Sequence, residues 1–438
     1  MLEKDKAKVE KTVPTVSRRL DDGTVIDLVY SPGTKRTSLA VCSAGVISVW
    51  DSFTTSFGER LVPVPGSNNL IRHRALFLAE KPEPFGSAVE LVQAIDDYIF
   101  RYVDLSDQFR RIASYYVLLS WVHDAFNELP YLRLRGDFGS GKTRALSVIG
   151  SLCYKAFFAS GASTVSPIFH TLDTFQGTLI LDEADFRFSD EKSELVKILN
   201  NGNTKGFPVL RTAVTAKREF DPRAFSVFGP KIVAMRQSFE DPALESRFLT
   251  EEMGLRSLRD DIPINLPDRQ KEEALALRNK LLSYRFALLP KIKVDDSLVD
   301  PTLSPRSNQI LVPLLSIVDD EELRDEVRAV ARFLEDAQSS VRSSSSEAQV
   351  LEVLFSLFAE SDRSHVPVAE VTASMIEHYG GEYDRPLTHR YIGNILRKRL
   401  HLTTYKRHGV YVIPAAMREQ VNILCKKYGV SEADPDIG

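Results

Sequence analysis

A glycine-rich segment in the first half of the chain constrains its fold more than any other feature. Residues 136–143 read GDFGSGKT, which fits the pattern G-x-x-x-x-G-K-[ST], between the strand-like run LRLRG and a helical run that begins at Lys142. In such a strand–loop–helix unit, backbone N–H groups and the positive end of the helix dipole surround a phosphate. A glycine-rich turn that binds nothing is the alternative, and the flanking pattern disfavours it. The residues expected to bind phosphate are Gly136, Asp137, Phe138, Gly139, Ser140, Gly141, Lys142 and Thr143.

An acidic pair follows forty residues after Lys142, where the apolar run TLIL ends in Asp182 and Glu183. Alone, such a pair is usually a solvated strand end, but its position after the glycine-rich loop favours a catalytic role. Lys142 is expected to reach the β- and γ-phosphates of ATP, and the Thr143 hydroxyl and Asp182 to hold Mg²⁺. Glu183 is expected to polarise the attacking water. The two motifs therefore predict ATP and Mg²⁺ as cofactors and ATP hydrolysis as the chemistry.

Short apolar runs alternate with helical patterns through the middle of the chain. AFFASG, GTLILDEAD and KIVAM are expected to be strands, with helices between them. This alternation predicts an α/β fold with a three-layer core and a mostly parallel sheet. The pattern divides the chain into a β-rich N-terminal module at 1–105, a P-loop core at 106–265, a helical lid at 266–338, a serine-rich flexible linker at 339–346, a compact module at 347–425 and an acidic tail at 426–438.

Composition adds few constraints. The chain has 438 residues, 43% of them hydrophobic and 26% charged, and a formal charge of −4, as in an ordinary globular protein. A nucleic-acid surface would therefore have to be a local basic patch. The three cysteines lack metal-ligand spacing, and the charged N-terminus is unlike a secretory signal. With no apolar run long enough to span a bilayer, the expected location is the cytoplasm.

Two further motifs follow the expected strand KIVAM. The strand ends in Arg236 and Gln237, which are placed to sense a γ-phosphate, and DPALESRF brings Arg247 soon after. On these motifs the chain resembles AAA+ ATPases over residues 110–330, especially mini-chromosome-maintenance helicases and clamp loaders. The resemblance implies that Arg247 is an arginine finger inserted into a neighbouring subunit's ATP, with a surface salt bridge as the alternative. It also implies that Arg306 is the lid arginine called sensor two, with an ordinary helix-start arginine as the alternative.

Two strand-like runs, FPVLRTAV and FDPRAFSVF, precede KIVAM and are joined by a segment that contains Lys217 and Arg218. This arrangement resembles the pore hairpin of superfamily 3 helicases, and the resemblance implies that the two cations hold a phosphate backbone without reading sequence. A solvated hairpin tip is the alternative. Superfamily 3 proteins end their sensing strand in Asn, whereas Arg236 and Gln237 stand here. The closest likeness is to helicase-like ATPases of mobile genetic elements.

The last part of the chain reads as three helices followed by a hairpin with glycine at its tip, which is the layout of a winged helix. Its third helix and hairpin could lie on DNA, although many winged helices bind only protein. The residues expected to contact nucleic acid there are Arg390, Arg397, Lys398, Lys406 and Arg407.

These features together predict a DNA helicase or translocase that assembles as a homohexameric ring and replicates a mobile element. The N-terminal module would dock replication proteins, and no membrane partner is expected. The rival interpretation is an AAA+ switch, such as an initiator, transcriptional or defence ATPase, which assembles on DNA or a partner without unwinding it. A scaffold that binds nucleotide without hydrolysis is a third, disfavoured by Glu183 and Arg247.

Overall fold

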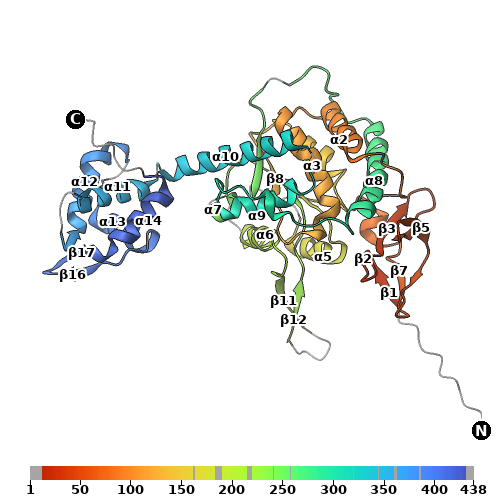
Figure 1. Ribbon diagram of the computed structural model, residues 1–438, viewed down its shortest axis with the longest axis horizontal. Coiled ribbons are helices and arrows are strands. Elements are labelled where there is room, and N and C mark those ends of the chain that lie inside the picture. Colours follow the sequence, from red (N-terminus) through yellow and green to blue (C-terminus); the bar gives the residue numbers. More distant parts are fainter. Residues whose placement is uncertain are drawn as a thin grey trace, which may run out of the picture. The chain divides into compact units, whose positions relative to one another are not determined.

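The chain forms two compact units, residues 1–328 and 329–438, as seen in a computed structural model (Figure 1). Each unit has its own core and is described separately. The structure describes residues 12–160, 163–182, 190–214, 220–239, 241–256, 258–318, 320–343, 345–359, 363–383 and 386–430.

A five-stranded parallel sheet is the centre of the first unit. Its strands lie in the order β14 (Phe248–Glu252), β8 (Tyr131–Arg135), β13 (Lys231–Met235), β10 (Leu179–Leu181) and β9 (Phe157–Ala159). Every neighbouring pair is parallel, which confirms the predicted α/β class with a parallel sheet. The strand order differs from the chain order, and β13 separates the two strands that carry the glycine-rich loop and the acidic pair.

Helices cover both faces of this sheet. One face is covered by α5 (Val165–Phe175) and α6 (Asp190–Asn201), and the other by α3 (Asp107–Val122) and α4 (Lys142–Gly150). Leu179 and Leu181 join the core under α5 and α6, whereas Ile180 between them points at α4. A Cβ at Gly150 would lie 2.9 Å from the Ile180 side chain, so glycine lets α4 approach the sheet closely. Successive strand residues thus fill two cores, which explains the uninterrupted apolar strands.

The N-terminal segment is β-rich, as the sequence predicts. An antiparallel sheet contains β2 (Ser17–Arg19), β3 (Val25–Ser31), β4 (Arg36–Ser43) and β5 (Val46–Trp50), and a smaller one contains β1 (Thr12–Thr15), β7 (Arg60–Pro63) and β6 (Phe53–Thr54). A short helix, α1 (Asn69–Arg72), and then α2 (Ala88–Tyr102) lead to the P-loop core.

A buried ionic cluster joins this segment to the core and to helix α8 (Asp268–Leu288). Asp27 on β3 accepts hydrogen bonds from Lys155 Nζ at 2.8 Å and Arg285 Nε at 2.9 Å, and Arg285 also pairs with Asp124 at 2.7 Å. Burial lowers the pKa of Lys155 to about 8, although Asp27 acts in the opposite direction. Because these charges lie in one interior, the predicted module, core and first lid helix belong to a single compact unit.

The helical segment expected at 266–338 continues with α9 (Pro305–Leu315) and α10 (Glu321–Ser343). The prediction of a flexible linker at 339–346 is wrong over most of that range, because α10 extends to Ser343 and α11 begins at Ser346. The buried residues Leu323, Val327 and Ala331, at helical spacing, anchor the first half of α10, and no proline or glycine follows them before Ser343 to end the helix.

The second unit contains the three helices and the glycine-tipped hairpin that the sequence predicts. Its elements are α11 (Ser346–Ala359), β15 (His365–Pro367), α12 (Val368–Tyr379), α13 (His389–Asn394, continued as a π-turn over Ile395–Arg399), β16 (Tyr405–Arg407), β17 (Val410–Pro414) and α14 (Arg418–Tyr428). The strands pair antiparallel in the order β15-β17-β16. The predicted acidic tail begins too early, since α14 extends to Tyr428 with Val421 and Cys425 buried on one face.

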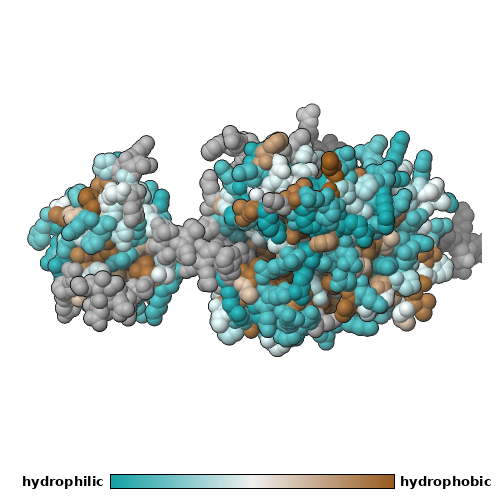
Figure 2. All heavy atoms as spheres, turned by 90° about the horizontal axis from the view of Figure 1, so that it is seen from above, coloured by the Kyte–Doolittle hydropathy of each residue, from teal (hydrophilic) through white to brown (hydrophobic). Residues whose placement is uncertain are grey.

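Hydrophilic atoms predominate on the face of the molecule shown in Figure 2, with hydrophobic residues scattered among them. Within the part of the chain that the structure describes, no helix has the length and apolar character needed to cross a bilayer.

Candidate nucleotide-binding site

The carboxyl ends of the five parallel strands meet at one edge of the sheet. Gly136 follows β8, Asp182 follows β10, Arg236 follows β13 and Met253 follows β14. Parallel α/β sheets bind ligands at this edge, where the loops that leave neighbouring strands converge. The topology therefore brings the glycine-rich loop and Asp182 to the same side of the sheet, with the end of β13 between them.

The glycine-rich loop needs its glycines. Gly139 and Gly141 have φ of 78° and 88°, the left-handed region that side chains rarely adopt. At Gly136, a Cβ would lie 2.5 Å from the carbonyl oxygen of Met253. The loop therefore packs against the end of β14 at its base and curls tightly at its tip, where Phe138 is 88% exposed.

Lys142 is the first residue of α4, and its ammonium group lies against the loop. Lys142 Nζ donates to the carbonyl oxygens of Gly136 and Asp137, each at 2.6 Å, and to Ser140 Oγ at 3.3 Å. Gly141 is the N-cap and offers the helix no side-chain acceptor, so the N–H groups of the first turn can bind an anion. This donor set fits a phosphate chain, and the Thr143 hydroxyl and Asp182 carboxylate are ligands of the type that Mg²⁺ prefers.

A cavity of about 330 Å³ lies beside the glycine-rich loop. It is lined by the loop, by Val103 and Asp104 before α3, and by the chain after β14. Arg144 on α4 donates to the carbonyl oxygens of Pro263 and Ile264, which fixes the far wall. A mostly apolar cavity of this size beside a phosphate site can hold a nucleobase. Sequence reasoning missed it because its walls come from segments about 160 positions apart, Val103 and Pro263.

Arg247 lies at the opposite edge of the sheet. It directly precedes Phe248, which pairs in register with Tyr131 at the start of β8. The length of that strand, about 16 Å for its five residues, therefore separates Arg247 from the glycine-rich loop. Arg247 Nη1 donates to Asn200 Oδ1 at 2.5 Å and to the Leu199 carbonyl oxygen at 3.2 Å. Its Nε is buried and has no hydrogen-bond partner among the described residues.

Arg306, on α9, lies near Arg247 rather than near the loop. Arg306 Nη2 donates to the carbonyl oxygen of Ala243, at 2.7 Å, in the short helix α7 (Pro242–Glu245) that precedes Arg247. Burial lowers the pKa of the Arg247 guanidinium, and the neighbouring charge of Arg306 lowers it further. The two arginines are thus brought together at the amino edge, away from the phosphate site of their own chain.

The candidate sensing residues Arg236 and Gln237 are exposed directly after β13. Gly136 N donates to the carbonyl oxygen of Met235 at 3.3 Å, so the ends of β13 and β8 are in contact. The backbone of Arg236 therefore lies beside the glycine-rich loop. A residue that senses a γ-phosphate is expected at this position. Glu183 lies outside the described residues.

The two runs before β13 form an antiparallel hairpin, as predicted. They are β11 (Val209–Val214) and β12 (Phe220–Phe225), paired from Val209 with Phe225 to Val214 with Phe220. The hairpin projects from the α/β body (Figure 1). Lys217 and Arg218 belong to its tip in sequence and lie outside the described residues.

The five cations predicted in the second unit are all exposed: Arg390, Arg397, Lys398, Lys406 and Arg407. Arg397 stacks on the Tyr411 ring at 5.3 Å, and Arg407 Nη1 lies 2.9 Å from His365 Nδ1. Arg399, in contrast, pairs with Glu347 at 2.8 Å.

Comparison with known proteins gave structural similarities alone. No family model and no curated protein matches the sequence. Among solved structures, the NrS-1 C-terminal region is 11% identical, with a TM-score of 0.37 over 89% of this chain and 96% of that one. A full-length MCM homolog from Methanopyrus kandleri is 12% identical, with a TM-score of 0.37 over 73% and 79%. JCV helicase is 14% identical, with a TM-score of 0.25 over 57% and 61%. Similarities of this size do not assign the chain to a family.

Proposed function

We propose that this protein is an ATP hydrolase that assembles as a ring, with six subunits expected, and moves along DNA. One observation carries the proposal. A complete phosphate-binding loop lies at the carboxyl edge of the sheet, while Arg247 and Arg306 lie together at the amino edge. A ring brings the amino edge of one subunit to the carboxyl edge of the next, and so completes an active site that one chain leaves open.

Within the site, each residue has a separate task. The loop N–H groups and Lys142 bind and orient the phosphates of ATP, and the neighbouring cavity holds the base. Mg²⁺, held by Thr143 and Asp182, would neutralise charge on the β- and γ-phosphates. Glu183 orients the water and accepts its proton, and Arg236 or Gln237 contacts the γ-phosphate. Arg247 of the adjacent subunit stabilises the charge that develops in the transition state, which makes hydrolysis depend on assembly.

Two cationic regions support DNA as the substrate. The hairpin tip carries Lys217 and Arg218 in sequence, and the second unit exposes five cations on α13, its π-turn and β16. We propose that the tip holds the DNA backbone inside the ring and that the second unit is a winged helix that also binds DNA. Contacts of this kind are independent of sequence and weaken as salt rises.

The first test measures ATP hydrolysis with and without single-stranded DNA, together with mass in solution with ATP and strand displacement on a forked substrate. Stimulation by DNA, a ring-sized assembly and unwinding are expected. Glu183→Gln should bind ATP but not turn it over, because binding and water activation depend on different residues. ATP-dependent assembly without unwinding would instead identify a switch that assembles on DNA.

A change at the hairpin tip distinguishes a motor that moves along DNA from a switch that only assembles on it. Replacing Lys217 and Arg218 with Ala removes two phosphate-binding cations and leaves the nucleotide site intact. A motor needs its tip to hold the backbone as subunits step, so strand displacement and stimulation by DNA should be lost while basal hydrolysis remains. Full unwinding by the double variant would show that the tip does not hold DNA.

A further inference from the structure

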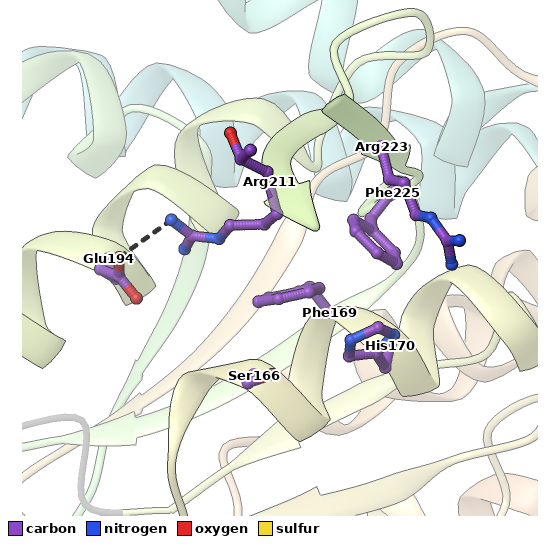
Figure 3. A pocket seen from close by; sticks show the side chains of 8 residues that line it. Ser166, Phe169, His170, Glu194, Arg211, Arg223 and Phe225 are labelled. Carbon is purple, nitrogen blue, oxygen red and sulfur yellow. Dashed lines mark ion pairs between the residues drawn. The ribbon is translucent and has the colours of Figure 1, made fainter. Parts of the chain in front are cut away.

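A second cavity, of about 340 Å³, lies between the base of the hairpin and helices α5 and α6 (Figure 3). It is lined mainly by Phe169, His170, Glu194, Arg211, Arg223 and Phe225. None of these side chains takes part in the nucleotide site, and the cavity is large enough for one nucleotide.

Three aromatic rings form one wall of this cavity. Phe225 on β12 lies 4.9 Å from Phe169 and 4.5 Å from His170, measured between ring centroids, and meets His170 edge to face at 76°. Phe169 is 4% exposed and supports the wall from below, whereas His170 is exposed and Phe225 is partly exposed. The accessible rings can therefore pack against a planar ligand.

The hairpin also contributes two arginines to the cavity, one on each side of Phe225, and their guanidinium groups point apart (Figure 3). Arg211 on β11 and Arg223 on β12 are paired directly in register, so their side chains project from the same face of the hairpin. Arg211 is held in place by Glu194 at 3.0 Å and by the Phe169 ring at 5.2 Å. Arg223 approaches Asp221 at 3.6 Å, and its side chain is 64% exposed.

The charges of the two arginines are balanced to different extents. Glu194 balances Arg211 closely, whereas the Asp221 carboxylate is further from Arg223 and is itself half exposed. The exposed Arg223 guanidinium can therefore bind a further negative group. The cavity therefore combines a surface for a planar ring with a position for an anion next to it.

We propose that this cavity binds one nucleotide of single-stranded DNA, with the base against Phe225 and His170 and a backbone phosphate on Arg223. The proposal rests on the proposed function, because it supplies a stacking site for the strand that the hairpin tip holds. A single strand is required, since the faces of a base are available for stacking once it leaves the duplex. Such stacking tolerates any base, as a moving ring needs.

The test compares two probes of equal length and charge: an oligonucleotide of about 20 thymidines, several times the expected contact length, and the same backbone without bases. Phe225→Leu keeps apolar packing on Phe169 but removes the ring. Its affinity for the thymidine probe should fall about 5- to 150-fold, the loss expected for one stacked base, with unchanged affinity for the base-free probe. Phe225→Trp should retain tight binding of the thymidine probe. Arg223→Ala should weaken binding of both probes to a similar extent, because it removes a phosphate contact.

The matched control is Phe207→Leu, since Phe207 is 60% exposed just before β11 and does not line the cavity. This control should bind both probes as the unaltered protein does. Equal thermal unfolding of the Phe225→Leu and Phe207→Leu variants would show that the Phe225 change does not act through folding. Unaltered protein that binds no single-stranded DNA would overturn the proposed function itself. Strong DNA binding that is indifferent to Phe225→Leu and Arg223→Ala would overturn the cavity alone.

Discussion

The two edges of the central sheet carry different sets of candidate functional residues. The carboxyl edge carries the residues proposed to bind phosphate and Mg²⁺, all from one chain: the glycine-rich loop, Lys142 across it, and Asp182 at the end of β10. The amino edge carries Arg247 and Arg306, which donate hydrogen bonds to backbone and amide oxygens on α6 and α7.

In the proposed mechanism the two edges have different roles. ATP binds at the carboxyl edge of one subunit, whereas stabilising the transition state requires the amino edge of the next subunit as well. A strand about 16 Å long is rigid, so Arg247 cannot reach the loop of its own chain by a side-chain movement. Changes at the carboxyl edge should therefore act within a subunit, and changes at the amino edge should act on its neighbour.

The largest effect is expected at the carboxyl edge. Lys142→Ala should abolish ATP binding, and with it hydrolysis, because it removes the charge that bridges the loop and the phosphates. Binding of a fluorescent ATP analogue and phosphate release measure the two quantities. Lys271→Ala, at an exposed lysine on α8, is the control and should match the unaltered protein. Unchanged ATP affinity of the Lys142 variant would remove the loop from the nucleotide site.

At the amino edge, Arg247→Ala should bind ATP normally and lose about 10³- to 10⁵-fold in hydrolysis, as expected for an arginine finger. Arg247→Lys should recover little, because a lysine ammonium does not form the paired contacts of a guanidinium.

Mixing two inactive variants tests whether Arg247 acts on the neighbouring subunit. A mixed ring of Lys142→Ala and Arg247→Ala subunits contains some interfaces with an intact loop on one side and an intact arginine on the other. Partial activity should therefore return. Variants that assemble together and still stay inactive would contradict an arginine supplied by the neighbour.

A change in the buried ionic cluster, away from both edges, should affect stability. Arg285→Met leaves Asp27 and Asp124 without their shared guanidinium, and breaking a buried ion pair costs about 3–5 kcal/mol. The free energy of unfolding from urea titration should fall by that amount. Arg269→Met, on the same helix but exposed, should stay within about 0.5 kcal/mol of the unaltered protein. Equal stability of the two variants would show that the cluster does not stabilise the unit.

The smallest effect is expected in the second unit. Replacing Arg397 and Lys398 with Ala should make the salt dependence of duplex DNA binding less steep. In a plot of log affinity against log salt concentration, the magnitude of the negative slope should fall by about 1.8, at about 0.9 per lost phosphate contact. Hydrolysis without DNA is the internal check on the nucleotide site. An unchanged slope would indicate that this unit binds protein instead.

The sequence by itself determined the strand–loop–helix unit at the carboxyl edge. The loop motif needs a strand before it and a helix after it, and both are present as β8 and α4. The parallel sheet and the hairpin could also be predicted, because apolar runs and turn residues specify them locally. Short-range patterns failed at two boundaries: α10 continues into a serine-rich segment, and α14 extends to Tyr428, three residues into the predicted acidic tail.

Tertiary structure alone decided which distant residues meet. Asp27, Asp124, Lys155 and Arg285 each resemble ordinary surface charges in the sequence, yet they share one interior and join three predicted domains. The cavity beside the glycine-rich loop and the aromatic cavity under the hairpin likewise combine segments that no spacing rule connects. The reason is physical. A local motif fixes backbone geometry over a few residues, whereas a cavity or a buried charge depends on how whole layers pack, and that is set by the complete core.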